Sequence, residues 1–319
     1  MPQIDLRHML VMTDGTAMLQ HAKCATPNLH HGYCTDDNAR ALIAGVLYLD
    51  LHPETHEGDF PIEQAPGYVI VAMQRYLAFL WYAFNPEEGR FRNFMHFDRT
   101  WLERVGSPDS HARALWGLSI AATMPALEDI RQLADNLFLQ ALPAVRGFRY
   151  IHSQCYSLLG LHEYISGGGM DSDEPREVER KLAETVLDRW KKNADDDWPW
   201  WNDCLTWGNP KLPHGMLVAG KDLGNNEMMD AALKSLRWLA EIQTDDRGCL
   251  SVVGNAGWFP KKGVCARYDQ QPIEVQGMVQ ACLAAAKITG DAYWTDQAVR
   301  CFEWFRGRNI NDAIMINEN

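Results

Sequence analysis

The stretch His30–Leu42 reads HHGYCTDDNARAL, and it changes character in the middle. Its first half is polar, aromatic and broken by a glycine, which is typical of a loop. Asp36 and Asp37 then open an apolar run, and acidic residues favour the first turn of a helix because the backbone N–H groups there are unpaired. One carboxylate is enough for a helix cap. The second leaves two interpretations open, a cap of an ordinary helix or part of a functional site.

A second copy of this pattern supports the functional interpretation. The sequence DSHARAL at 109–115 repeats DDNARAL at 36–42, with Asp, Ala, Arg, Ala and Leu at the same offsets. Both copies follow a loop and begin an apolar helix, so they predict repeated helical units. Polar helix starts that gather at one end of such units would form a site.

The hydrophobic periodicity of the chain is helical almost throughout. A short helix is expected near residues 5–12. Longer helices are expected at 37–50, 67–84, 109–123, 127–142, 148–166, 175–193, 211–222, 226–243, 271–288 and 291–307. They form five pairs, in which the first helix is apolar nearly all round and the second carries charge on one side. Because an apolar helix is buried and an amphipathic one faces solvent, this alternation predicts an inner and an outer ring.

The predicted fold is therefore an all-α, (α/α)6-type toroid of helical hairpins, with a few short β-hairpins in the loops. A sixth pair needs a contribution from the N-terminal segment or from residues beyond Asn319, so the C-terminal part of the toroid is expected to be incomplete. The chain has no linker and no shift in composition, so residues 1–319 are predicted to form a single domain.

Composition narrows the classes of function. The net charge of −12 argues against a nucleic-acid partner or an anionic membrane surface, since neither attracts an acidic protein. No secretory signal or membrane-spanning segment is recognised. The eight cysteines are dispersed without a C-x-x-C pair, which is typical of reduced thiols in a cytoplasmic protein. No metal signature such as H-E-x-x-H occurs. We expect no metal and no cofactor.

Several motifs now suggest a family. The repeated Asp-x-x-Ala-Arg-Ala-Leu helix starts, the loop Trp198–Trp201 and the segment Tyr268–Glu274 resemble the six-hairpin, (α/α)6-toroid glycosidase superfamily. More closely, 32–40 and 109–116 resemble a bacterial domain found alone or fused to group-1 glycosyltransferases. The resemblance covers most of the chain and implies an oligosaccharide substrate, with a glycosyltransferase as a partner. One departure is that further polar sequence is expected after Arg308, so the last wall of the site is expected to be short.

The candidate catalytic residues are carboxylates. A glycosidase needs one protonated and one ionised carboxyl, and an inverting enzyme places them ~6.5–9.5 Å apart to admit a water molecule. Asp36 or Asp37 is predicted to supply one of them. The opposing carboxylate is predicted to come from Asp203, Asp269 or Glu274, although each also fits a structural role. Because Glu274 is expected to be buried in an apolar helix, it needs a partner such as an arginine.

The candidate substrate-binding residues are polar or aromatic side chains at the helix starts and in the loops that precede them. Tryptophan faces stack on the apolar face of a sugar ring, and arginines contact hydroxyl groups or serve as structural ion-pair partners. The predicted set is His31, Tyr33, Arg40, Asp109, His111, Arg113, Trp200, Trp201, Trp258, Tyr268 and Gln271.

The main functional prediction is a glycoside hydrolase that acts on an oligosaccharide by carboxylate general acid–base catalysis. One alternative is a non-catalytic glycan-binding toroid that works with a glycosyltransferase. Another is a sugar epimerase or lyase that uses a histidine pair for proton transfer, as sugar 2-epimerases with this toroid do. The candidate histidines are His31, His96, His111, His152 and His214.

Overall fold

The structure is a computed structural model that describes residues 4–52, 66–124, 127–169 and 173–316. The chain forms two compact units, Met1–Val178 and Glu179–Asn319, and the boundary between them falls within helix α7 (Asp173–Asn193). The expectation of a single domain stays a prediction. In both units the secondary structure is helical with short strands, which confirms the predicted all-α class.

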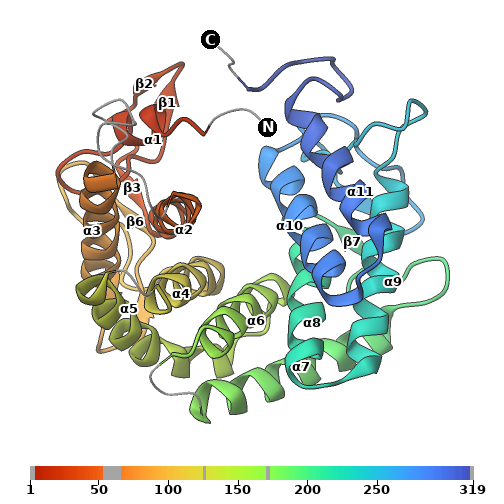
Figure 1. The fold of residues 1–319 in the computed structure, drawn as a ribbon, viewed down its shortest axis with the longest axis horizontal. Helices are drawn as coiled ribbons and strands as arrows, with labels where there is room; N and C mark the ends of the chain where they lie inside the picture. The colour runs from red at the N-terminus through yellow and green to blue at the C-terminus, as the bar shows by residue number, and fades with distance from the viewer. Residues whose placement is uncertain (1–3, 53–65, 125–126, 170–172, 317–319) are drawn as a thin grey trace. The chain divides into compact units, whose positions relative to one another are not determined.

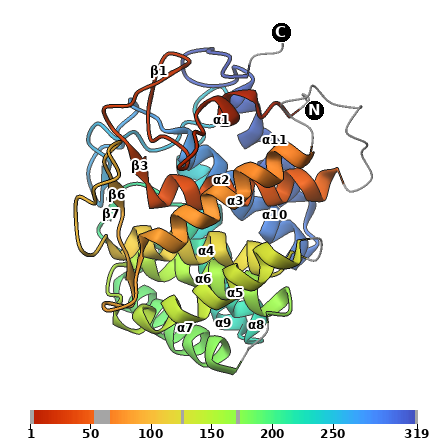
Figure 2. The ribbon, with the colours of Figure 1, turned by 90° about the vertical axis from the view of Figure 1, so that its left-hand side faces the viewer.

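The first unit is built from helical hairpins. Its helices besides α7 are α1 (Arg7–Val11), α2 (Thr35–Leu51), α3 (Pro66–Ala83), α4 (Pro108–Ala122), α5 (Glu128–Ala141) and α6 (Ile151–Ser166), with a 3-10 helix η3 (Leu142–Gly147). Helix α2 packs on α3 and α4, and α4 packs on α5 and α6. The first helices of each pair, α2, α4 and α6, therefore form an inner row that α3 and α5 flank (Figure 1). Figure 2 views this unit from the side of α3 and α5.

The contrast between inner and outer helices follows from their sequences. Helix α4 buries residues around its whole circumference, whereas α5 buries one face at helical spacing. Small residues let the inner helices approach closely. A Cβ atom on Gly117 would lie 2.8 Å from the carbonyl oxygen of Ala39, so the contact between α4 and α2 requires a glycine there.

Short strands join the loops that precede α2 and α4. Strand β3 (Tyr33–Cys34) pairs with β6 (Phe94–Met95), and β4 (Phe84–Asn85) pairs with β5 (Arg90–Phe91), both antiparallel. Gly32 has a φ of +66°, and a Cβ atom there would lie 2.1 Å from the Met95 carbonyl oxygen. Glycine is therefore needed at this position for the β3–β6 pairing that holds the starts of α2 and α4 side by side. A further pair, β1 (Ala22–Lys23) with β2 (Thr26–Pro27), lies in the loop before α2.

The second unit repeats the hairpin arrangement. Its helices besides α7 are α8 (Lys211–Asp222), α9 (Asn226–Ile242), α10 (Pro272–Thr289) and α11 (Ala292–Phe302), followed by a 3-10 helix η4 (Glu303–Phe305). Helix α8 packs on α9 and α10, and α10 packs on α11. Strands β7 (Cys204–Leu205) and β8 (Phe259–Pro260) join two of its loops. Every helix expected from periodicity is present, with bounds that differ by a few residues.

Candidate functional site

The N-terminus of α2 is fixed by the loop that precedes α4. The backbone N–H of Thr35 donates to the Asn93 carbonyl at 2.9 Å, and its hydroxyl donates to the Arg92 carbonyl at 2.7 Å. The N-cap residue of α2 is Cys34, which makes no side-chain capping bond. Asp36 and Asp37 thus lie inside the first turn, and neither is the N-cap of the helix.

Helix α4 begins in a different way. Its N-cap is Ser107, whose hydroxyl accepts a hydrogen bond from the Ser110 N–H at 3.0 Å, and Pro108 follows at the first helical position. Asp109 is therefore not the cap either. Because these helix starts do not use their aspartates as caps, the capping interpretation explains none of Asp36, Asp37 and Asp109.

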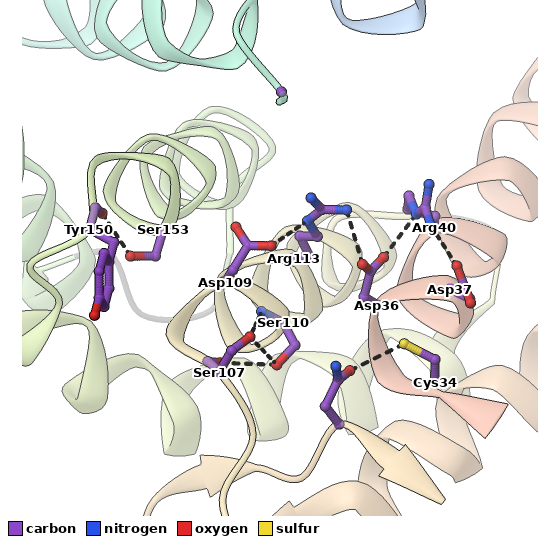
Figure 3. A network of polar contacts seen from close by, with 12 residues as sticks. Cys34, Asp36, Asp37, Arg40, Ser107, Asp109, Ser110, Arg113, Tyr150 and Ser153 are labelled. Carbon is purple, nitrogen blue, oxygen red and sulfur yellow. Dashed lines mark hydrogen bonds and ion pairs between the residues drawn. The ribbon is translucent and has the colours of Figure 1, made fainter. Parts of the chain in front are cut away.

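The aspartates instead form a row of ion pairs with the two repeated arginines, here called the charge ladder: Asp37, Arg40, Asp36, Arg113 and Asp109 (Figure 3). Within each helix the Asp and the Arg four residues later are paired, with Arg40 Nε 3.0 Å from Asp36 and Arg113 Nε 3.0 Å from Asp109. Arg113 Nη1 also lies 3.0 Å from Asp36, which links α4 to α2. Arg40 Nη2 lies 2.5 Å from Asp37 at the end of the ladder.

Burial differs along the ladder. The Arg113 side chain is 6% exposed and its guanidinium lies 4.6 Å from the centre of the Tyr156 ring of α6, whereas Arg40 is 42% exposed. Burial opposes the charge on Arg113, but Tyr156, Asp36 and Asp109 together raise its pKa. Burial raises the pKa of Asp109 to about 6, although Arg113 opposes the rise. Burial and the charge of Asp36 raise the pKa of Asp37.

This arrangement supplies two chemical functions within one short row. Burial raises the pKa of Asp109 to about 6, and its Oδ1 is buried without a hydrogen-bond partner among the described residues. The neighbouring guanidiniums carry fixed positive charge and N–H donors, which stabilise an oxygen that becomes negative during a reaction. A carboxyl with such a pKa beside a fixed cation is suited to general acid–base catalysis.

Two residues predicted to contact substrate are structural in this unit. His111 is fully buried, where its Nδ1 accepts from the Phe91 N–H at 3.3 Å and its Nε2 lies 3.0 Å from the Ala141 carbonyl. Burial lowers its pKa to about 3, so the ring is neutral. Tyr33 is 1% exposed and donates to Asp14 at 2.6 Å. Burial and the hydrogen bond to Asp14 raise its pKa to about 12.

His31 is exposed. Its ring lies 4.6 Å from that of His21, centre to centre, and the two rings are nearly perpendicular. His21 also acts on the pKa of Asp37, although burial is the larger influence there. His96 is exposed, and His152 and His214 are half-buried.

Glu274 lies at the start of α10 in the second unit and is 1% exposed. The Gly208 N–H, the Asn209 N–H at 3.2 Å and the Asn209 side chain at 3.1 Å all donate to its carboxylate. These donors take the place of the arginine partner that the sequence suggested. Burial raises the Glu274 pKa to about 7, against these hydrogen bonds. The carboxylate joins the loop before α8 to α10.

The other candidates of the second unit lie at its surface. Asp203, Tyr268, Asp269 and Gln271 are exposed, and Gln271 rather than Asp269 is the N-cap residue of α10. As partners of Asp36 or Asp37 in catalysis, Asp203, Asp269 and Glu274 remain predictions.

Two of the three loop tryptophans that were predicted to stack on a sugar are buried. Trp200 and Trp201 are 1% and 0% exposed. Trp200 packs 5.7 Å from Trp238, centre to centre, and Trp201 donates from Nε1 to the Val186 carbonyl at 3.1 Å. Their ring faces are covered by the core of the second unit, so they offer no platform for a sugar. Trp258 alone of the three is exposed, at 39%.

Sequence reasoning missed Tyr156, which covers the buried guanidinium of the ladder. Its position in the first turns of the third inner helix, α6, was the available signal, because the starts of neighbouring inner helices lie together. Among the described residues, no group of three or more His, Cys, Asp or Glu is placed to hold a metal ion. No helix in the described ranges is long and apolar enough to cross a membrane.

Comparisons with known proteins place the fold. No family model and no curated protein matches the sequence. Cellobiose 2-epimerase from Bacillus thermoamylovorans is similar in structure, with a TM-score of 0.72 and 11% identity over 94% of this chain and 84% of that one. A sugar epimerase from a ruminal bacterium (TM-score 0.67, 12% identity) and a D-mannose isomerase (0.67, 13%) also match over 94% of this chain, and over 82% and 83% of theirs. The chain has the all-α toroid fold of these structures.

Proposed function

We propose that this protein is a carbohydrate-active enzyme that moves a proton on a sugar, as an epimerase or an isomerase does. The structurally similar enzymes carry out such reactions, which favours this alternative over the glycoside hydrolase expected from the sequence. At such low sequence identity, structural similarity shows only that the folds agree. The argument for the reaction therefore depends on the charge ladder.

The observation that carries the proposal is the contact of Asp109, a carboxyl with a pKa of about 6, with the buried cation Arg113. In the proposed reaction the Asp109 carboxylate takes the proton from C2 of an open-chain sugar, and the electron pair moves onto the carbonyl oxygen. Arg113 stabilises the resulting enediolate. Rotation about the C2–C3 bond of the bound enediolate presents the other face of C2 to Asp109, and return of the proton there gives the epimer. Return of the proton to C1, with the O2 hydroxyl proton passing to O1, gives the ketose.

The contact between His21 and His31 does not supply an opposite-face pair of bases. Epimerisation with two bases needs one on each side of the sugar carbon. The His21 and His31 rings are only 4.6 Å apart, centre to centre, so they leave no room for a sugar between them. Asp109 is therefore preferred to the His21–His31 pair as the base.

The test is deuterium exchange at C2. The protein is incubated in D2O with cellobiose and with D-mannose, and loss of the C2 proton is followed by NMR. These two sugars are chosen because they appear in the names of the structurally similar enzymes. We expect exchange by the wild type and a loss of roughly 10²–10⁴-fold in Asp109→Asn, the usual share of one acid–base group. The matched control is Asp129→Asn, an exposed aspartate in the first turn of α5, which should keep the wild-type rate.

The pH dependence gives a second measurement on the same samples. Because the ionised carboxylate is the base, the exchange rate should rise with pH through about 6, and Asp109→Asn should lose this dependence. Release of glucose from cellobiose without deuterium at C2 would establish hydrolysis instead. An Asp109→Asn variant as active as the wild type would exclude Asp109 as the base.

A further inference from the structure

The second unit contains a pocket of about 280 Å³ between the loop before α10 and the segment after η4. Its walls include Tyr268, Asp269 and Gln270 from the loop and Trp304, Asn309 and Asn311 from the segment. Pockets that bind drug-sized molecules have volumes of ~300–1,000 Å³, and this pocket lies at the lower end of that range. Its size therefore suits a ligand of about one sugar ring.

Three side chains of the pocket have free polar groups. Tyr268 is 69% exposed, and Asp269 and Asn311 are also exposed. Among the described residues, the Tyr268 hydroxyl, the Asp269 carboxylate and the Asn311 side-chain amide have no hydrogen-bond or ion-pair partner. They are thus free to bind a ligand.

The frame around these side chains is fixed. Gln270 accepts from the Trp304 indole N–H at 3.1 Å and donates to the Ser251 hydroxyl at 3.0 Å. Buried Asn309 donates to the carbonyls of Trp304 and Ala313 at 2.8 and 2.7 Å. A pocket whose walls are held in place loses little entropy when a ligand binds.

The backbone around Asp269 is held in place as well. Asp269 has a φ of +59°, in the left-handed region that aspartate tolerates better than most residues other than glycine. Its carbonyl accepts from the Asn255 N–H at 3.1 Å, and a Cβ atom on Gly254 would lie 2.0 Å from the Tyr268 carbonyl oxygen. The loop before α10 is therefore held against residues 254–255, with Tyr268 turned outward.

We infer that this pocket is a subsite for one ring of a neutral sugar, with Tyr268 as the stacking platform and Asp269 and Asn311 as hydroxyl ligands. This inference rests on the proposed function, which makes a sugar the expected ligand, and it concerns the second unit alone. An aromatic face packs on the apolar C–H face of a pyranose, and a carboxylate beside an amide accepts from and donates to vicinal hydroxyls. Among the described residues, those that line the pocket include no cationic side chain, which disfavours an anionic ligand. Asp269 is then a binding residue of this pocket.

The test is equilibrium binding of cellobiose and of D-mannose to the full chain by isothermal titration calorimetry. Tyr268→Ala and Asp269→Asn should each weaken binding roughly 10-fold, the effect of one aromatic contact or one charged hydrogen bond. The matched control is Tyr68→Ala, which removes a half-exposed tyrosine from α3 and should leave the affinity unchanged. Because the substituted side chains are exposed, all variants should unfold at the wild-type temperature.

The outcomes separate this inference from the proposed reaction. If the wild type binds sugar without C2 exchange and Tyr268→Ala loses affinity, the subsite is supported and the reaction is wrong. If exchange occurs and the pocket variants keep the wild-type affinity, the subsite is wrong and the reaction stands. Absence of binding by the wild type to both sugars also overturns the subsite.

Discussion

The first turns of α4 and α10 both carry a carboxylate, but its partners differ between the two helices. Asp109 of α4 faces a guanidinium and its side chain is 24% exposed. Glu274 of α10 is 1% exposed and accepts hydrogen bonds from the loop before α8. The same chemical group at the same place on a helix thus serves an open charged site in one unit and a structural connection in the other. Partners and exposure, more than helix position, indicate which carboxylate is available to a substrate.

The largest effect is expected where the charge ladder is buried. Arg113→Met leaves Asp36 and Asp109 without their shared cation, and removal of one partner from a buried ion pair costs about 3–5 kcal/mol. Arg40→Met, the matched change on α2, affects a side chain that is 42% exposed and should cost about 1 kcal/mol or less. Denaturant unfolding of both variants measures the difference. Equal losses of unfolding free energy in the two variants would show that Arg113 and Arg40 are equally exposed to solvent.

The sequence predicted the ladder better than the rest of the site, for a physical reason. The Asp and the Arg four residues later lie on one face of a helix, so the repeated motif itself places Asp36 with Arg40 and Asp109 with Arg113. The same rule would have excluded His111, because a residue two positions after Asp109 points to another face, into the core. The burial of His111 could therefore be predicted from its position in the helix, although its residue type suggested a site residue.

The burial of the loop tryptophans could not be predicted from the sequence in this way. Whether Trp200 faces solvent or the core depends on Trp238, which lies on α9 and is distant in sequence. Local composition marks the segment as a loop, but it does not reveal which ring another helix covers. Likewise, the donors to Glu274 come from a loop more than 60 residues away, so periodicity predicted its burial and not its partners.

A smaller effect is expected from Glu274→Gln. The amide NH2 that replaces one carboxylate oxygen faces N–H donors, so at least one buried donor loses its acceptor, at a cost of about 1–3 kcal/mol. The matched control, Glu227→Gln in the first turn of α9, changes an exposed side chain and should cost under about 0.5 kcal/mol. Hydrogen exchange of the Gly208 and Asn209 amides should accelerate in Glu274→Gln only. Unchanged exchange would show that this carboxylate does not hold the loop.

The smallest expected effect is the pH dependence of stability that Asp109 contributes. Burial raises its pKa from 3.8 to about 6 in the folded chain. Between these values the unfolded chain has released the proton while the folded chain keeps it, so the Asp109 contribution to stability falls as pH rises from about 4 to 6. The partial exposure of the side chain reduces the effect to roughly 1 kcal/mol.

Asp109→Asn removes this contribution, so its stability relative to the wild type should improve by that amount across the same window, whereas Asp129→Asn should show no change.

For Glu274 the window runs from 4.5 to about 7, and the stability of Glu274→Gln relative to the wild type should keep improving above pH 6. The wild type and these three variants are unfolded thermally from pH 4 to 7.5. The pH above which the stability of a variant relative to the wild type no longer rises distinguishes the two carboxylates. A constant difference between Asp109→Asn and the wild type would mean that Asp109 is already ionised at pH 4. In that case Arg113 dominates over burial, and the carboxyl is a fixed anion of the ladder instead of a base that titrates near neutral pH.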